Sequence, residues 1–341
     1  MSDSEINIFV SIAPSHNRSF ESLLKTESLK GKKILINIGN YEYSPRMWDA
    51  VIEDYSPMRN PSSENLLATI LFQLKKILAY KRIISSCKKK IPSKGYTLFY
   101  CNLEDILNNF MFFRFRKNLQ EERILVEDGI LNYYEYKIES PRKPNFILKK
   151  ILCWFLRVPY KVVEGQLSGI DRDDVQKQFV RYPSLALFPE KALRLESDII
   201  DFEPSEDSIL FIGQDVLANI VAKQDYLDGI NQIIEKIQEN CSTASKVHYK
   251  PHRNGDYKIA EELLIKAFGN QYELVIDERP VETILSNIRP MYIYSFFSSA
   301  LFNIKLGAKD VDKLKVFSLP INQVDNLVLN LFRKVDIIVM K

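Results

Sequence analysis

Short runs of apolar and β-branched residues recur along the chain, and stretches with apolar residues at helical spacing separate them. In the first half, four runs predict strands: 6–12, 33–39, 96–100 and 123–126. Three stretches between them predict helices: 19–24, 64–84 and 104–118. Strands that alternate with helices indicate βαβ units, and hence an α/β fold with a mostly parallel sheet.

The alternation starts again in the second half. Strands are predicted at 208–214, 273–276 and 291–295, and helices at 225–239 and 260–268. The stretch at 171–204 has weak periodicity and three prolines, so we interpret it as the crossing between two domains. A chain of 341 residues exceeds the usual size of one core, and we therefore expect domains at 1–190 and 191–341.

Composition narrows the class of protein. Hydrophobic residues at 46% and charged residues at 27% are typical of a globular protein with a sizeable core. A net charge of +3 is too small for a nucleic-acid binder. The four cysteines lack CxxC spacing, which predicts free thiols in a reducing compartment. Without a signal peptide or a membrane-spanning apolar run, the sequence predicts a cytoplasmic protein, with contact to a membrane surface left open.

The first candidate site is the run from His248 to Arg253, HYKPHR, which holds two of the three histidines beside two cations. It follows a predicted strand, and imidazole, ammonium and guanidinium groups together can neutralise a phosphate. His252 could also donate a proton to a leaving group. The alternative is a solvated loop in which these side chains have no ligand.

Two further segments of the second half fit such a site. Ser298 and Ser299 follow a predicted strand and open a helix, so their hydroxyls and the free N–H groups can receive an anion. Glu282 could accept hydrogen bonds from a ribose. Each also has an ordinary explanation, because serine is a preferred N-cap and a carboxylate suits the first turn of a helix.

In the first half, Glu127 and Asp128 stand at the end of the strand predicted at 123–126, before Gly129. Open α/β sheets place ligands at the carboxyl ends of their strands, so one of these carboxylates could act as a general base toward a hydroxyl. Asp-Gly is also an ordinary turn signal.

Three other patterns carry weaker indications. Asp171-Arg172-Asp173 matches the DxD pattern of metal-dependent sugar transfer. It stands directly before 175–179, where Asp173 or Asp174 would serve as an N-cap, and we favour this role over a metal site. The basic runs at 75–94 and 146–161 are typical of solvated helix faces. The second run places Trp154 and Phe155 among cations, so an anionic membrane surface is the alternative.

The Glu-Asp-Gly segment, the Phe-Ile-Gly-Gln segment that ends at Gln214, the Lys-Pro-His segment and the Ser-Ser pair resemble motifs of the bacterial sialyltransferases. The chain is most similar to glycosyltransferase family 52, the lipooligosaccharide sialyltransferase group, with kinship to the bacterial polysialyltransferases. This resemblance implies a GT-B fold of two Rossmann-like domains with the active site in the cleft between them. It also implies CMP-N-acetylneuraminic acid as donor and inversion at the anomeric carbon.

The resemblance also assigns roles. Asp128 or Glu127 would be the base, and His252 would contact or protonate the CMP phosphate. Asp215 or Asp228 is the alternative base. The remaining nucleotide-binding residues would be Lys250, Pro251, Arg253, Glu282, Ser298, Ser299, Gly213 and Gln214. Arg253 stands where the His-Pro pattern has proline, so this loop departs from the family.

No cofactor and no metal are expected, because a histidine, hydroxyls and a helix terminus can stabilise a leaving CMP. The implied acceptor is a galactose-terminated glycan of a bacterial lipooligosaccharide, O-antigen or capsule, reached at the inner face of the membrane. Linkage, polymerisation and a homodimer are left open. Two alternatives remain: a glycosyltransferase that uses a nucleotide-diphosphate hexose, and a non-catalytic α/β protein that binds a membrane or a polyanion.

Overall fold

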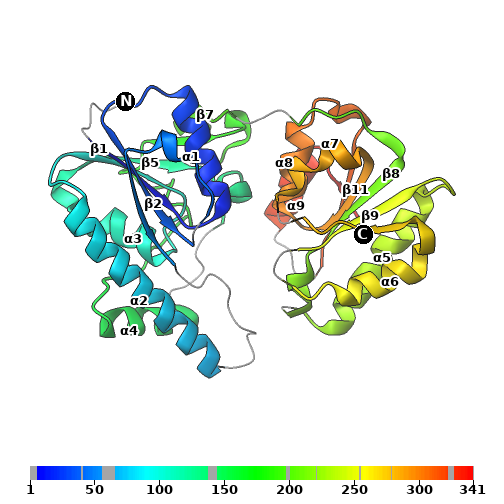
Figure 1. Ribbon diagram of the computed structural model, residues 1–341, viewed down its shortest axis with the longest axis horizontal. Helices are drawn as coiled ribbons and strands as arrows, with labels where there is room; N and C mark the ends of the chain where they lie inside the picture. Colours follow the sequence, from blue (N-terminus) through cyan, green and yellow to red (C-terminus); the bar gives the residue numbers. More distant parts are fainter. Residues whose placement is uncertain are drawn as a thin grey trace. The chain divides into compact units, whose positions relative to one another are not determined.

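The computed structural model divides the chain into two compact units, Met1–Ser197 and Asp198–Lys341, each built on one sheet (Figure 1). The structure describes residues 6–39, 41–55, 66–136, 144–196, 200–219, 221–252, 255–277, 279–321 and 326–340. The expected boundary after residue 190 lies seven residues earlier than this division. The difference arises because residues 192–194 still pair with the first sheet.

The first unit contains a seven-stranded sheet whose pairs are all parallel. In spatial order its strands are β3 (Ala50–Asp54), β2 (Lys32–Ile38), β1 (Ile6–Ser11), β4 (Tyr96–Tyr100), β5 (Gln120–Val126), β6 (Lys177–Val180) and β7 (Ala192–Arg194). The helices are α1 (Pro14–Thr26), α2 (Leu66–Lys90), α3 (Ile106–Phe113) and α4 (Pro144–Phe155). The four strands predicted in this half are confirmed.

Both faces of this sheet are covered, which explains why its central strands are apolar throughout. On β1, Ile8 and Val10 pack into a core shared with α2 and α3, whereas Phe9 packs on the opposite side with Phe20 of α1. All six residues of β1 are buried. Continuous apolar runs are the signature of parallel strands buried on two faces.

The stretch at 171–204 is not only a crossing between domains. Strands β6 and β7 lie inside it and extend the first sheet beyond β5. They contain four and three residues, too few to show a period of two in the sequence. The N-cap role expected for Asp173 or Asp174 is also wrong, because β6 follows them instead of a helix.

The second unit contains a six-stranded sheet whose pairs are all parallel. In spatial order its strands are β10 (Tyr272–Leu274), β9 (Lys246–Lys250), β8 (Ser205–Ile212), β11 (Pro290–Phe296), β12 (Lys315–Leu319) and β13 (Ile338–Val339). Its helices are α5 (Lys223–Asn240), α6 (Lys258–Phe268), α7 (Leu285–Ile288), α8 (Ser299–Gly307) and α9 (Asn326–Lys334). The strand expected before the histidine motif in fact includes its first three residues.

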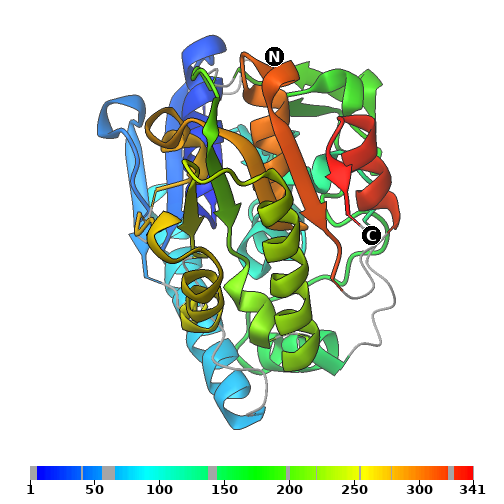
Figure 2. The same ribbon diagram turned by 90° about the vertical axis from the view of Figure 1, so that its right-hand side faces the viewer.

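Helices α5 and α6 lie side by side over one face of this sheet (Figure 2). They share a core with alternate residues of the strands, such as Ile209 and Phe211 of β8. The four cysteines of the chain are free thiols, as predicted. Within the described residues, no helix is long and apolar enough to cross a bilayer.

The order of the strands reverses at one place in each sheet. In the first sheet, β2 lies on one side of β1 and β4 on the other; in the second, β9 and β11 flank β8 in the same way. Crevices outside the carboxyl ends of strands at such a reversal are the usual ligand sites of open α/β sheets. In the second sheet most candidate residues follow β9, β8 and β11; in the first, Glu127 and Asp128 follow β5, the strand next to β4.

Candidate active site

At the carboxyl edge of the first sheet, three neighbouring strands bring three polar side chains together. Strands β1, β4 and β5 are adjacent. Asp128 follows β5, Asn102 follows β4, and His16 lies in the first turn of α1 after β1. His16 Nε2 lies 3.1 Å from Asp128 Oδ1, and Asn102 Nδ2 donates to Asp128 Oδ2 at 2.8 Å. The carboxylate is therefore held at both oxygens.

The tautomer of His16 follows from its other ring nitrogen. The backbone N–H of Ile12 donates to His16 Nδ1 at 3.3 Å, so Nδ1 carries the lone pair and Nε2 carries the proton. Nε2–H thus donates to Asp128. The His16 side chain is 1% exposed whereas that of Asp128 is 23% exposed, so only the carboxylate can meet a ligand directly.

The ionisation of Asp128 is set by opposing effects. Burial raises the pKa of its carboxyl, but the interactions with His16 and the hydrogen bond from Asn102 outweigh burial and bring the pKa below its ordinary value. Asp128 is therefore ionised at neutral pH. Its own backbone N–H donates to Asn132 Oδ1 at 3.0 Å, which fixes the turn that carries it.

Glu127 has a different environment although it is the adjacent residue. It is 2% exposed, and its carboxylate accepts from the Arg181 backbone N–H at 2.7 Å and from Arg181 Nε at 2.6 Å. The Tyr133 hydroxyl donates to it as well. These contacts fasten the end of β5 to the segment after β6. The carboxylate of Glu127 is thus occupied in the structure, and Asp128 is the one accessible to an acceptor hydroxyl.

At the carboxyl edge of the second sheet, three adjacent strands carry most of the residues expected to bind the nucleotide. Gly213 and Gln214 follow β8, Lys250 ends β9, and Ser298 and Ser299 follow β11. Pro251 and His252 are partly exposed in the loop after β9. The parallel pairing brings these segments to one edge. Arg253 lies outside the described residues.

The buried carboxylate of Asp215 holds the loop after β9 in place at this edge. It is fully buried, and Oδ2 accepts from the backbone N–H of His252 at 2.7 Å. The hydroxyl of Tyr226 donates to Oδ1 at 3.1 Å, and the hydroxyl of Tyr249 donates to the same oxygen. A carboxylate with no exposed surface cannot reach a substrate hydroxyl. Asp215 therefore fixes the His252 loop, and Asp228, the other alternative base, lies exposed on α5.

Lys250 is also committed to the fold. It is 8% exposed, and its Nζ donates to the backbone carbonyl of Asp277 in the segment after β10. Burial lowers the pKa of this lysine from its ordinary value. The ammonium contributes positive charge to the edge while it ties the end of β9 to the next loop.

The two serines differ in what they contact. Ser298 is the N-cap of α8, and its Oγ accepts from the N–H of Ala300 at 3.3 Å. Ser299 is exposed in the first turn. Glu282 lies in a short 3₁₀ turn, Val281–Thr283, and its Oε1 accepts from Asn303 Nδ2 of α8 at 3.1 Å. Glu282 and the serine segment are thereby linked.

The histidine pair of the sequence has two separate environments. His248 lies within β9, opposite Glu273 of β10, with 3.7 Å between its Nδ1 and Glu273 Oε2. Burial lowers its pKa. His248 therefore belongs to the β9–β10 pair, and His252 alone lies in the loop at the edge.

Carboxylates of the DxD segment and of the next residue form hydrogen bonds within the first unit. Asp171 Oδ2 accepts from the backbone N–H of Gln166 at 3.0 Å, and Asp174 pairs with Arg172 through two hydrogen bonds of 2.8 and 3.1 Å. Within the described residues, no group of three His, Cys, Asp or Glu side chains is arranged to hold a metal ion.

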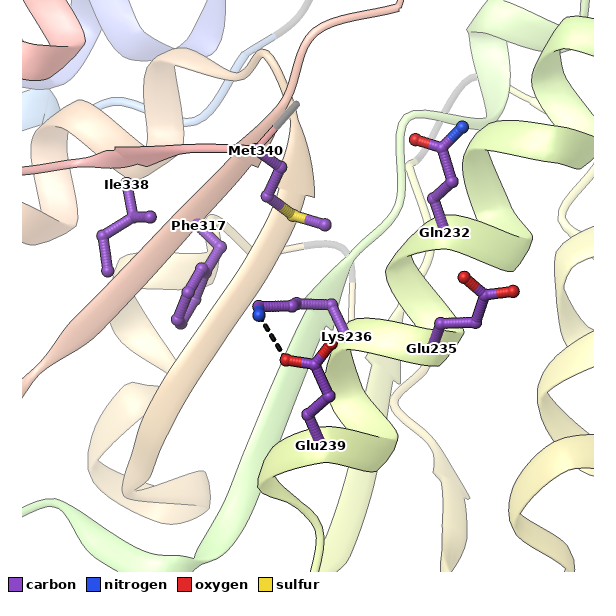
Figure 3. A pocket seen from close by; sticks show the side chains of 7 residues that line it. All are labelled: Gln232, Glu235, Lys236, Glu239, Phe317, Ile338 and Met340. Atoms are coloured by element: carbon purple, nitrogen blue, oxygen red, sulfur yellow. Dashed lines mark hydrogen bonds and ion pairs between the residues drawn. The ribbon is translucent and has the colours of Figure 1, made fainter.

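The second unit also has a groove of about 350 Å³ (Figure 3). It is bounded by α5 and strands β12 and β13, and its lining includes Glu235 and a Lys236–Glu239 ion pair. Two carboxylates around one paired cation do not favour a phosphate. None of the expected site residues lines it.

Sequence reasoning missed His16 and Asn102. Both stand just beyond predicted strands, a position that marks ligand sites in parallel sheets and could have drawn attention to them.

Solved structures show the class to which this fold belongs. The GT-B domain of a sialyltransferase from Photobacterium damselae superposes with a TM-score of 0.54 at 11% identity, over 98% of this chain and 99% of that one. A glycotransferase of kitacinnamycin gives a TM-score of 0.52 at 8% identity, over 100% of this chain and 87% of that one. A UDP-GlcNAc 2-epimerase from Methanocaldococcus jannaschii gives 0.50 at 12% identity, over 98% and 88%. These similarities identify the fold as GT-B, as predicted.

The family follows from the sequence match. The family model described as alpha-2,8-polysialyltransferase matches residues 7–310, so the chain belongs to this family. No curated protein sequence matches the chain. The expected membership among bacterial sialyltransferases is confirmed, and the chain is a glycosyltransferase of this type. The matched region includes both groups of candidate residues.

Proposed function

We propose that this protein is an inverting, metal-independent sialyltransferase that uses CMP-N-acetylneuraminic acid. Membership of the polysialyltransferase family supports the reaction class. The observation that carries the mechanism is the environment of Asp128, an ionised and partly exposed carboxylate held by His16 and Asn102.

Asp128 is the general base. It removes the proton of the acceptor hydroxyl while the acceptor oxygen bonds to the anomeric carbon of sialic acid and the bond from that carbon to the phosphate oxygen breaks. His16 is a positioning residue, because Nε2 already carries a proton and Nδ1 already accepts one hydrogen bond. Neither nitrogen is available to take the proton from Asp128. Glu127, held by Arg181 and Tyr133, stabilises the strand end.

The leaving CMP is received by the edge of the second sheet. His252 contacts or protonates the phosphate, Ser299 binds it at the positive N-terminal end of α8, and Lys250 adds positive charge. Glu282, oriented by Asn303, accepts from the ribose hydroxyls. Because a phosphate monoester can be stabilised by such donors, the reaction proceeds without a divalent cation.

The acceptor is a hydroxyl of a bacterial surface glycan, and we take a terminal galactoside as the first candidate. The family match favours a second candidate, in which the enzyme extends an α2,8-linked sialic acid chain. In either case we place the enzyme on the cytoplasmic side, at the inner face of the membrane.

The test is release of CMP from CMP-N-acetylneuraminic acid in EDTA, with no acceptor, with lactose or with an α2,8-linked oligosialic acid. Release stimulated by lactose supports the galactoside acceptor, and release stimulated only by the oligosialic acid supports chain extension. Thermal shifts with CMP, CDP, UDP and UDP-glucose identify the nucleotide, because a ligand of the native state raises its melting temperature. Stabilisation by UDP-glucose without CMP release would replace this donor by a nucleotide-diphosphate hexose.

A further inference from the structure

Helix α4 presents a second apolar face away from the core that anchors it. Cys153 is buried and Leu152 packs against the core, while Ile147, Ile151 and Trp154 lie outside it with exposed fractions of 47%, 55% and 80%. Phe155 is 72% exposed. The spacing of these four exposed residues puts them on one stripe. A helix on the surface of a water-soluble unit would ordinarily be polar there.

Helix α2 packs against α4 (Figure 1). It carries a similar stripe of exposed apolar side chains. Its Leu67, Leu71 and Leu78 are 65%, 50% and 42% exposed and are spaced by four and seven residues. We call these seven side chains the α2–α4 surface: Leu67, Leu71, Leu78, Ile147, Ile151, Trp154 and Phe155. They are half of the fourteen large apolar side chains exposed among the described residues, so the exposure is concentrated.

The charged residues of the two helices themselves are all basic. Three of them are engaged by the rest of the unit, because Arg82 pairs with Asp54, Lys76 pairs with Asp105, and Lys149 donates to the carbonyl of Glu104. Residues 66–90 contain seven basic and no acidic residues, and residues 144–163 contain four basic and none acidic. Since the chain has a net charge of +3, the rest of it carries a net charge of −8. Exposed lysines flank the stripes, including Lys75 on α2 and Lys150 on α4. Basic charge is therefore concentrated on the two helices that expose these apolar side chains.

We propose that the α2–α4 surface docks the protein on an anionic phospholipid bilayer, lying in the interface without crossing it. An anionic bilayer supplies an apolar layer for Trp154, Phe155 and the aliphatic side chains, and negative headgroups for the lysines. A second copy of this chain fits less well, because two strongly basic surfaces would face each other. The proposal does not depend on the donor or acceptor of the reaction.

The direct test is sedimentation with vesicles of phosphatidylcholine alone or of phosphatidylcholine and phosphatidylglycerol in equal parts. We expect at least about tenfold tighter binding to the anionic vesicles, and weaker binding at high salt, because the attraction is partly electrostatic. Equal and weak sedimentation with both vesicles would overturn the proposal.

The two tryptophans give a second readout at the predicted contact. Trp48 is 8% exposed and Trp154 is 80% exposed, so only Trp154 changes from water to an apolar environment on docking. Its emission should shift to the blue with anionic vesicles, and Trp154→Phe should abolish the shift. A shift that persists in Trp154→Phe would contradict the proposed orientation.

Paired variants distinguish binding through the α2–α4 surface from nonspecific adsorption to vesicles. Trp154→Ala/Phe155→Ala should weaken vesicle binding by about tenfold or more, while Ile265→Ala/Ile276→Ala, which removes exposed side chains of the second unit, should not. Lys75→Glu/Lys150→Glu should weaken it by about tenfold or more, and Lys258→Glu/Lys266→Glu on α6 should have a smaller effect.

Three outcomes would overturn the lipid assignment. The first is vesicle binding by Trp154→Ala/Phe155→Ala that equals the wild type. The second is a dimer in solution that this variant dissolves, without vesicle binding by the wild type. The third is capture by dextran sulfate, a polyanion without lipid, where vesicles fail to bind. Transfer to a soluble acceptor should be unchanged in this variant, so a failure of the proposed reaction is distinguishable from a failure of docking.

Discussion

The carboxyl edges of the two sheets have the same topology and opposite chemistry. In the first, a carboxylate faces outward and its donors, His16 and Asn102, stand behind it. In the second, the carboxylate of Asp215 is behind, and the loop that it fixes presents His252. An edge with a partly exposed carboxylate offers a proton acceptor. An edge whose carboxylate is buried beneath a loop offers the hydrogen-bond donors of that loop to an anion.

Adjacent residues show the same distinction within one edge. Glu127 is closed off by Arg181 and Tyr133, whereas Asp128 keeps part of its carboxylate exposed. Residue type and sequence position therefore do not decide which carboxylate is accessible. The hydrogen-bond donors around each one do.

The strongest way to test this comparison is Asp128→Asn. We expect turnover to fall by at least about 100-fold, because the general base is lost while the size of the side chain is kept. Circular dichroism and the melting temperature check that the fold is intact. Turnover within a fewfold of the wild type would remove Asp128 from the mechanism.

Glu127→Gln is the matched control. The unfolding free energy should fall by about 3 kcal/mol, because Arg181 loses its buried partner. The turnover of the folded variant should fall less than the turnover of Asp128→Asn does. The reverse pattern would exchange the roles of the two residues.

His252→Ala tests the second edge. Turnover should fall by about 100-fold, since a contact with the departing phosphate is lost, while the hydrogen bond from the backbone N–H of this residue to Asp215 is kept. Steady-state kinetics measure the turnover, and a thermal melt checks that the fold is intact. Unchanged turnover would leave the second edge as a binding surface only.

His16→Ala should lower kcat/KM by about tenfold and move the acid limb of its pH profile upward. The wild-type carboxyl has a lowered pKa, so its ionised form persists to a pH below the ordinary range and is lost only as pH falls through that lowered value. Removing His16 removes part of this effect. His16→Gln keeps a donor near Asp128 and should restore most of the rate and the position of the limb; a profile that is the same in all three proteins would make His16 purely structural.

The smallest effects distinguish the two serines. Ser298→Ala should lower stability by about 1 kcal/mol through loss of the N-cap, whereas Ser299→Ala should leave stability unchanged and weaken CMP binding by roughly threefold. Thermal melts and CMP titration separate the two. If neither variant changes CMP affinity, the serine pair is a helix cap and nothing more.

The sequence predicts the longer strands well because parallel strands buried on two faces are continuous apolar runs. It misses β3, β6, β7, β12 and β13, which contain five, four, three, five and two residues, too few to show a clear period. Glu127 and Asp128 are identified as candidates by their position after a strand, but their separate environments depend on contacts that no local pattern contains.

The partner of Asp128 shows this limit clearly. His16 is 112 residues away in the chain, and only the order of β1, β4 and β5 in the sheet brings the two together. Likewise, Asp215 and His252 are predicted as two possible catalytic groups. In the structure, Asp215 accepts a hydrogen bond from the backbone N–H of His252 and so holds that residue in place.

The Glu-Asp-Gly segment also has a consequence for how such proteins evolve. Glu127 is held by its ion pair with Arg181, Asp128 by the proposed reaction, and Gly129 by a backbone φ of 57° that other residues adopt with difficulty. Selection would then preserve three consecutive positions for three unrelated reasons: stability, chemistry and backbone geometry. A duplicated copy of the gene released from catalysis should keep the first and third residues and lose the second.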